Sequence, residues 1–363
     1  MKIVSTGEQY DFYGDSLKVY DVLPAQTYQV VFSPKEGFHL EKYSEVDTSE
    51  PKIYGPHVAK VEKVFNAYKS MTRNLGVILS GAKGIGKTLF AKLLAQKALE
   101  EGYPLIVVDA YYPGIASFLE QIDQKVMILF DEFEKTFKKI DGVEPMNEML
   151  PLFDGLTGGN KLFVVTCNEI HSLNDFLVNR PGRFHYHFRF EYPLPEEIAD
   201  YLHDKLSEEY YREIPAVINF SRKVSLNFDC LRAIAFELNT GLSFPEAIKD
   251  LNILDLNMEK YDVTITFKDG SEKKYEKKIN MFSSDKETIS GYDFYGDNYG
   301  EVSFIPVEGE YDALRNCFVF KREKLTSEIY IEGDNKDSEK WEKDQVIQVI
   351  VRRQRQNSIH YVL

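Results

Sequence analysis

Polar and apolar residues alternate along residues 19–32, where VYDVLPAQTYQVVF keeps a two-residue period around Pro24. Alternation of this kind, broken by Pro and Gly, predicts short β-strands over residues 1–45. The next stretch, SEVDTSEPK at 44–52, is polar and aperiodic and predicts a linker. We therefore expect a small N-terminal β module that covers residues 1–48.

The pattern changes over residues 49–193, where apolar runs alternate with segments of helical periodicity. The five apolar runs are GVILSG (76–81), LIVVDA (105–110), VMILFDE (126–132), LFVVTCN (162–168) and HYHFRFEY (185–192). Nearly continuous apolar runs are typical of strands buried on both faces, and their alternation with helices predicts a parallel sheet. We expect an α/β core with a five-stranded parallel sheet.

Two further regions follow the core. Residues 194–254 carry apolar residues at helical spacing, as in LPEEIADYLHDKLSEEYYREI, and FDCLRAIAFELN opens with an Asn-Phe-Asp cap signal. Over residues 255–363 the strand pattern returns, and YDVTITFKDGSEKKYEKKI predicts a hairpin with Asp269 and Gly270 in its turn. The prediction is a helical lid followed by a β-rich C-terminal domain.

Composition narrows the class of protein. The 363 residues are 43% hydrophobic and 28% charged, which is ordinary for a globular protein of two or three domains. A net charge of −14 and a pI near 5.1 argue against a general nucleic-acid binder. The three cysteines fit no metal or disulfide spacing and indicate a reducing compartment. Because no signal-peptide layout and no long apolar run is evident, we expect a cytoplasmic protein without membrane contact.

A phosphate-loop pattern, G-x-x-x-x-G-K-T, lies between the first core strand and the helical stretch LFAKLLAQKALEE. Glycines allow backbone N–H groups to surround phosphate oxygens at a helix N-terminus. Lys87 can reach the β- and γ-phosphates, and the Thr88 hydroxyl can ligate Mg²⁺. A chance glycine turn would not explain the position between strand and helix. The predicted nucleotide contacts are Gly81, Ala82, Lys83, Gly84, Ile85, Gly86, Lys87, Thr88 and Leu89.

Two strands contribute further polar side chains. VMILFDE ends in Asp131, which can hold the Mg²⁺ shell, and Glu132, which can polarise an attacking water. LFVVTCN ends in Asn168, which either contacts the γ-phosphate or the water, or only caps the strand. The pattern predicts Mg²⁺-dependent hydrolysis of a nucleoside triphosphate, with Lys87, Glu132 and Asn168 as catalytic residues.

The stretch LNDFLVNRPGRFHYHFRF at 173–190, together with these motifs, resembles the AAA+ ATPases. The likeness is to the AAA branch of unfoldases, protease motors and assembly factors, and NEMLPLFDGLTGG at 147–159 is similar to a helix of that branch. It covers about residues 50–250. The resemblance implies ATP as the nucleotide and a homo-oligomeric ring, most often a hexamer.

In that branch the two arginines of R-P-G-R act on the nucleotide of the neighbouring subunit, which makes Arg180 and Arg183 arginine-finger candidates. An arginine supplied in trans neutralises charge that develops on the transferred phosphoryl group. The alternative is a pair of surface arginines in a Pro-Gly turn.

The chain departs from the family pattern at several positions. His185 stands where the family usually has an acid. Arg232 lies where many members place a second sensor arginine, with an ordinary solvated arginine as the alternative. Tyr54 and Gly55 resemble the segment that contacts adenine, or form a linker turn. Tyr112-Pro113-Gly114 loosely matches an aromatic pore loop, but its connection is short, so either the loop is reduced or the ring threads no polypeptide.

Three alternative functions are consistent with such a ring. Remodelling or assembly of protein partners fits the acidic charge, the family resemblance and the added β modules. A nucleic-acid motor or loader is the alternative, although the basic clusters KKYEKK (273–278) and VRRQRQ (351–356) are also explained by solvated strand edges. A nucleotide-gated scaffold with little turnover is the third.

The hexapeptide YDFYGD occurs at residues 10–15 and again at 292–297. An identity of six letters is unlikely by chance even in a chain rich in Tyr, Phe and Asp. One hypothesis is a structural hairpin used twice, with packed aromatic residues. The other is a docking motif that both β modules expose to one partner.

Overall fold

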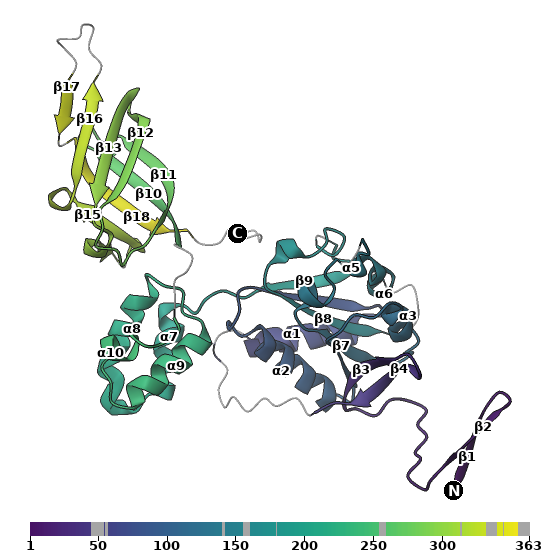
Figure 1. Cartoon of the computed structure of the whole chain (residues 1–363). Coiled ribbons are helices and arrows are strands. Elements are labelled where there is room, and N and C mark those ends of the chain that lie inside the picture. The colour runs from purple at the N-terminus through teal and green to yellow at the C-terminus, as the bar shows by residue number, and fades with distance from the viewer. Residues whose placement is uncertain are drawn as a thin grey trace. The chain divides into compact units, whose positions relative to one another are not determined.

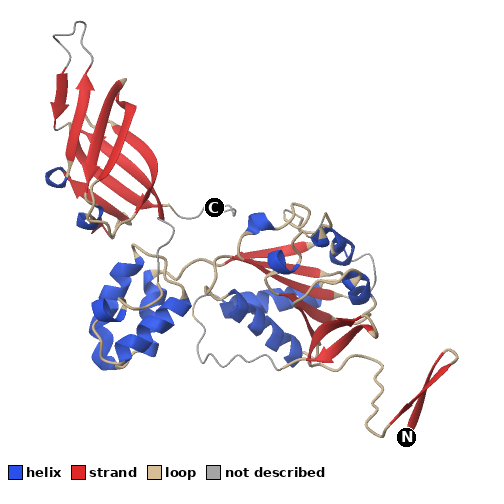
Figure 2. Cartoon of the chain, in the orientation of Figure 1, coloured by secondary structure: helices blue, strands red, loops and turns tan. Residues whose placement is uncertain are grey.

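The computed structural model describes residues 1–44, 54, 57–139, 142–154, 160–178, 180–253, 259–312, 314–331, 340–343 and 345–354. The chain forms two compact units, Met1–Ile214 with Leu226–Leu242, and Pro215–Ser225 with Ser243–Leu363. Figures 1 and 2 show helices and strands in both units. Within the described residues, no helix combines the length and the apolar character needed to cross a membrane.

The first unit contains a seven-stranded sheet in the order β4-β3-β6-β7-β8-β5-β9. Its strands are β3 (Thr27–Ser33), β4 (Gly37–Lys42), β5 (Leu75–Ser80), β6 (Leu105–Val108), β7 (Val126–Phe130), β8 (Lys161–Cys167) and β9 (Phe184–Arg189). The strands β5 to β9 are all parallel to their neighbours, as predicted. The α/β fold class with a parallel core sheet is therefore confirmed.

The N-terminal boundary predicted at residue 48 is wrong as the edge of a separate module. β3 pairs in parallel with β6, and β4 pairs antiparallel with β3, so both strands extend the core sheet. Tyr28 and Val30 of β3 are buried in the same apolar core as the parallel strands. Alternation predicts strands but does not say which sheet they join. The predicted linker at 44–52 lies, from residue 45 onward, outside the described residues.

Helices cover both faces of this sheet (Figure 1). α1 and α2 pack in one apolar core, whereas α3, α4 and α6 pack in the other. Alternate residues of each central strand point into the two cores, as Ile128 and Met127 of β7 do. The bounds are α1 (His57–Ser70), α2 (Lys87–Glu100), α3 (Ile115–Glu120), α4 (Phe133–Thr136), α5 (Pro145–Glu148), α6 (Leu150–Asp154), η1 (Ile170–Ser172), α7 (Pro195–Lys205), η2 (Glu208–Glu213) and α9 (Phe228–Asn239).

The second unit is mainly antiparallel β structure around one apolar core. Its sheets have the orders β11-β10-β18-β15-β14 and β12-β13-β16-β17. The bounds are β10 (Glu259–Phe267), β11 (Glu272–Ile279), β12 (Glu287–Tyr295), β13 (Asn298–Phe304), η3 (Pro306–Glu308), β14 (Glu310–Asp312), β15 (Cys317–Lys321), η4 (Arg322–Lys324), β16 (Thr326–Ile331), β17 (Lys340–Lys343) and β18 (Val346–Arg353).

The predicted lid at 194–254 is helical but divided between the units. α7, η2 and α9 belong to the first unit. Most of α8 (Ile214–Ser221) and all of α10 (Phe244–Ala247) belong to the second.

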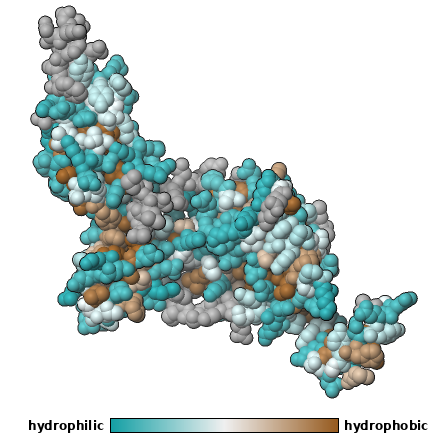
Figure 3. Space-filling view, in the orientation of Figure 1, coloured by the Kyte–Doolittle hydropathy of each residue, from teal (hydrophilic) through white to brown (hydrophobic). Residues whose placement is uncertain are grey.

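The two copies of YDFYGD have different environments. The first lies largely in β2 (Gln9–Tyr13), which pairs only with β1 (Lys2–Thr6) among the described strands. Phe12 is 66% exposed there, and Figure 3 shows hydrophobic residues at the surface of this N-terminal segment. The second copy forms the end of β12 and its turn, where Phe294 is only 1% exposed. Neither a packed hairpin nor an exposed docking motif describes both copies.

This difference predicts effects of very different size for the same substitution in the two copies. Phe294→Ala should destabilise the β-rich unit by roughly 3–5 kcal/mol, because it leaves a cavity against Phe267 and Tyr275. Phe12→Ala should change stability by less than about 0.5 kcal/mol. Denaturant unfolding of both variants measures the difference, and equal losses would contradict it.

Candidate nucleotide site

Three neighbouring parallel strands end at one edge of the core sheet. β8 lies between β7 and β5, and all three run in the same direction. The phosphate loop follows β5, Asp131 follows β7 and Asn168 follows β8. The carboxyl edge of a parallel sheet is where α/β folds bind ligands, and here it collects the three predicted polar motifs.

The phosphate loop depends on glycine where the chain turns toward α2. Gly84 has a φ of +72°, and a Cβ atom there would lie 2.6 Å from side-chain atoms of Asn227 and Asp229. Gly86 precedes α2 with a φ of 100°, and no side chain caps the helix. Its first backbone N–H groups therefore remain available for an anion. The Ile85 side chain is buried in the core, so this residue can offer a phosphate only its backbone.

Lys87 is the buried cation of the site. Its Nζ donates to the carbonyl oxygens of Gly81 (2.6 Å) and Ala82 (2.7 Å) and to Oδ1 of Asn168 (3.2 Å). Burial lowers the pKa of this ammonium, and the negative charges of Glu134 and Asp131 oppose that shift. The structure thus brings the predicted catalytic lysine and asparagine together.

Thr166 holds the two acids that follow β7. Its Oγ1 donates to Oδ1 of Asp131 (2.6 Å) and accepts the backbone N–H of Glu132 (2.8 Å). Glu132 has a φ of +46° and precedes α4 as its N-cap residue. Its carboxylate pairs with Lys135, which lowers the Glu132 pKa. The sequence analysis missed Thr166, although residues two apart on a strand share a face and Asn168 follows two positions later.

Asn168 is held by a carboxylate that the sequence analysis also missed. Its backbone N–H and its Nδ2 both donate to Oε1 of Glu134, at 2.9 and 2.8 Å. On the other side of the amide, Oδ1 accepts from Lys87, and the role of Asn168 in hydrolysis stays a prediction. The only sequence signal for Glu134 is a third acid soon after Asp131 and Glu132.

The predicted Mg²⁺ ligands fit a site completed by substrate. Thr88 is exposed in the first turn of α2, and Thr166 engages only one oxygen of Asp131. Across the described residues, no group of three His, Cys, Asp or Glu side chains could hold a metal by itself. Mg²⁺ commonly takes one or two protein oxygens and completes its shell with water and phosphate.

The two arginines of R-P-G-R have different environments. Arg183 donates through Nη2 to Oδ2 of Asp154 (2.7 Å), also pairs through Nε, and donates through Nη1 to the carbonyl of Phe176 (2.6 Å). This pairing raises the Arg183 pKa and lowers that of Asp154. Arg180 is exposed, with its guanidinium 5.5 Å from the centre of the Phe176 ring and no ion pair to any described residue. Only Arg180 is available to another molecule without breaking an ion pair.

Residues 77–192 match the family model described as "ATPase family associated with various cellular activities (AAA)". This segment is an AAA ATPase domain. Membership of this family implies that the segment binds ATP. Residues 77–192 include the strands and motifs of the site described above, apart from the first residues of β5.

Distant relatives share the AAA domain. An ATPase family AAA domain-containing protein of Arabidopsis thaliana is 29% identical over an alignment of 159 residues that covers 38% of this chain and 13% of the relative. The ATPase histone chaperone abo1 of Schizosaccharomyces pombe is 26% identical, with 34% and 12% covered. The ATP-dependent zinc metalloprotease FtsH of Aster yellows witches'-broom phytoplasma is 30% identical, with 37% and 23% covered. The match thus spans less than a quarter of each of these relatives.

The helix α9 contacts the phosphate loop of the AAA domain. The Phe228 N–H donates to the carbonyl of Gly84 (3.0 Å), and Nδ2 of Asn227 donates to that of Lys83 (3.1 Å). The predicted Asn-Phe-Asp cap signal thus lies at the start of α9, and the first turn of this helix contacts the phosphate loop. Arg232 lies on this helix with an exposed side chain, 3.7 Å from Asp229. Its role as a sensor stays a prediction.

Tyr54 belongs to an aromatic cluster with the lid helices. Its ring packs against Tyr201 of α7 and Phe228 of α9, and its hydroxyl donates to Asp204 (2.9 Å). The predicted adenine contact stays untested, and Gly55 lies outside the described residues.

The pore-loop candidate Tyr112 is packed within the chain. Its ring centre lies 5.3 Å from that of Phe32 and 6.4 Å from that of Phe38, on the added strands β3 and β4. The neighbouring Tyr111 donates its hydroxyl to Glu148 (2.7 Å). The segment is therefore anchored on both sides and does not present Tyr112 as a free aromatic.

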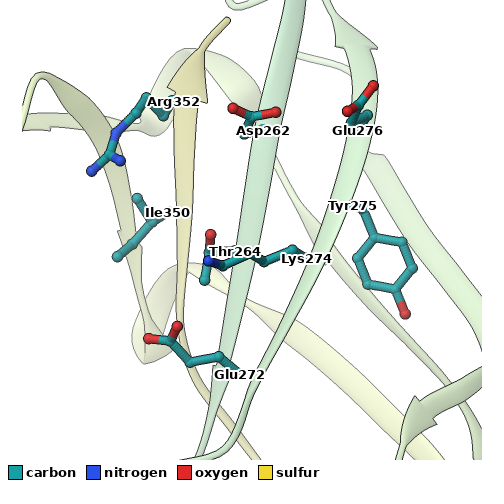
Figure 4. A pocket seen from close by; sticks show the side chains of 8 residues that line it. All are labelled: Asp262, Thr264, Glu272, Lys274, Tyr275, Glu276, Ile350 and Arg352. Carbon is teal, nitrogen blue, oxygen red and sulfur yellow. The ribbon is translucent and has the colours of Figure 1, made fainter. Parts of the chain in front are cut away.

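A hollow of about 550 Å³ lies on β10, β11 and β18 of the second unit (Figure 4). Acidic and basic side chains alternate along it, and most of them are exposed. It is lined by Asp262, Thr264, Glu272, Lys274, Tyr275, Glu276, Ile350 and Arg352. None of the predicted nucleotide residues is among them, so this hollow is not the predicted nucleotide site.

The arginine geometry predicts unequal effects on stability. Arg183→Ala should lower the free energy of unfolding by about 1–2 kcal/mol, because Asp154 and the Phe176 carbonyl lose their donor in a partly exposed setting. Arg180→Ala, in the same turn, should change it by less than about 0.5 kcal/mol. Denaturant titration of both variants provides the test, and equal stabilities would show that the Asp154 pair does not form.

Proposed function

We propose that this chain is a Mg²⁺-dependent ATPase whose AAA domains assemble into a homo-oligomeric ring, a hexamer by family resemblance, and that the ring remodels or assembles protein partners. The observation that carries the catalytic part is the convergence of Lys87, Asp131, Glu132 and Asn168 at the carboxyl edge of β5, β7 and β8.

Each of these groups has a distinct part in hydrolysis. Lys87 exchanges the loop carbonyls for β- and γ-phosphate oxygens, which demand a cation more strongly. Thr88 and Asp131 hold Mg²⁺, which neutralises phosphate charge when bound. Glu132 gives up its pairing with Lys135 and accepts a proton from the attacking water. Asn168 orients the water or the γ-phosphate.

A shared site between subunits is supported by the contrast between Arg180 and Arg183. A finger must reach a neighbouring nucleotide, and Arg180 is exposed without an ion pair to any described residue. Arg183 supports the turn that carries Arg180 through Asp154 and Phe176. We therefore assign the trans contact to Arg180 first, and to Arg183 only if assembly releases it.

A protein partner is favoured over nucleic acid by the basic cluster at 273–278. Lys273 pairs with Asp293, and Lys277 pairs with Glu287 (2.5 Å), so these two lysines are already neutralised. The packed Tyr112 argues against threading of polypeptide by this residue. Assembly or disassembly of partners at the ring surface fits both observations.

The first test concerns the water-polarising acid. Glu132→Gln should retain ATP binding but reduce turnover at least 10²-fold, because the amide cannot accept the proton. Phosphate release and ATP titration measure the two properties separately. Glu169→Gln, an exposed neighbour of Asn168, is the matched control, and near-normal turnover by Glu132→Gln would refute the assignment.

The second test concerns catalysis in trans. Arg180→Ala should bind ATP yet lose turnover by on the order of 10³-fold, the scale of an arginine finger. Mixing it with inactive Lys87→Ala subunits should restore activity, because one type of interface then has every group. Failure of mixtures to exceed their separate components would rule out a shared site.

A further inference from the structure

Glu134 is absent from the nucleotide-site prediction, yet it makes the closest contacts to Asn168. It lies on α4, whose first residue, Phe133, is fully buried in the apolar core with Phe130 and Phe153. That anchor fixes a helix of only four residues, and the side chain of Glu134 reaches across to the end of β8. A group held by a buried aromatic neighbour has little freedom to move.

One oxygen of Glu134 orients the whole amide of Asn168. Oε1 accepts both the backbone N–H and Nδ2, which leaves Oδ1 on the side of Lys87. An amide can place its donor and acceptor in two ways, and a carboxylate on one side with an ammonium on the other permits only one. The arrangement fixes which atom of the Asn168 amide faces Lys87 and which faces Glu134.

The second oxygen of Glu134 distinguishes this contact from ordinary packing. Oε2 is buried and accepts no hydrogen bond from the described residues. A buried carboxylate oxygen that no protein donor satisfies is unfavourable, which is unexpected of a contact that only ties α4 to β8. A purely structural tie between α4 and β8 would be made more favourably by a neutral side chain.

We propose that Glu134 is a positioning residue for ATP hydrolysis, which holds the Asn168 amide with Nδ2 toward α4 and Oδ1 toward Lys87. The inference rests on the proposed ATPase function and deepens it. Glu134 touches neither phosphate nor water in this role, and it acts through Asn168.

Two substitutions separate positioning from charge. Glu134→Ala removes the acceptor and should lower kcat about tenfold, within the range of coupling between residues of one network, with KM for ATP changed less than threefold. Glu134→Gln keeps a carbonyl oxygen that can accept the same two hydrogen bonds, and should remain within about twofold of the unmodified protein. Equal losses in both variants would overturn positioning and indicate that the negative charge acts directly.

A double-mutant cycle separates positioning from simple destabilisation. Asn168→Ala combined with Glu134→Ala should be no slower than Asn168→Ala alone, because Glu134 then has nothing to orient. Independent, multiplicative losses would show that Glu134 acts by another route. Glu169→Gln again serves as the control, and the melting temperature of each variant reports any loss of folding.

Nucleotide affinity can be measured even if the proposed ATPase function is wrong. If the unmodified protein hydrolyses no ATP, the ATPase proposal fails, and Asn168 is then examined by titration with ATP and with ADP. Glu134→Ala should reduce the preference for ATP over ADP by the same factor as Asn168→Ala, and leave ADP affinity unchanged. An unchanged preference in Glu134→Ala beside a reduced one in Asn168→Ala would overturn the proposal.

Discussion

The candidate site depends on the position of β8 between β7 and β5, in parallel with both. This order places Thr166 beside Asp131, so that one buried hydroxyl donates to the carboxylate and accepts the next backbone N–H. The same strand carries Asn168 to Lys87 on the other side. The sheet fixes the spacing between the ends of neighbouring strands, so side chains at these ends can hydrogen-bond to one another directly. The buried sheet therefore also keeps the site rigid.

Much of this arrangement could be predicted from the sequence, because its signals are local. Continuous apolar runs predicted parallel strands, and the phosphate loop stands between a strand and a helix as its chemistry requires. Asp131 and Glu132 follow their strand directly. Thr166, Glu134 and Asp154 could not be predicted in the same way, since each acts through a partner at least 29 residues away in sequence. Their roles depend on strand order and helix anchoring, which periodicity does not specify.

The strands β3 and β4 show that sequence periodicity predicts strands but not the strands with which they pair. Alternation predicted them correctly as strands, but β6, which pairs with β3, lies about 80 residues away in sequence. Once joined to it, they place Phe32 and Phe38 against Tyr112. An extension of the sheet therefore changes the interpretation of a loop that resembles a pore loop, because its aromatic residue packs against the added strands.

The repeated hexapeptide also shows that the surrounding structure decides the role of a sequence motif. Within β12, Tyr292, Asp293 and Phe294 fall where the ladder to β13 is interrupted, so side chains rather than backbone pairing hold this segment. Phe294 packs on Phe267, and the Tyr295 hydroxyl donates to Asp269 (2.9 Å). The first copy finds neither partner in β1, and its Phe12 remains exposed. Identical residues thus acquire a structural role only where the surrounding sheet supplies acceptors and an apolar surface, and sequence identity alone does not carry that role from one copy to the other.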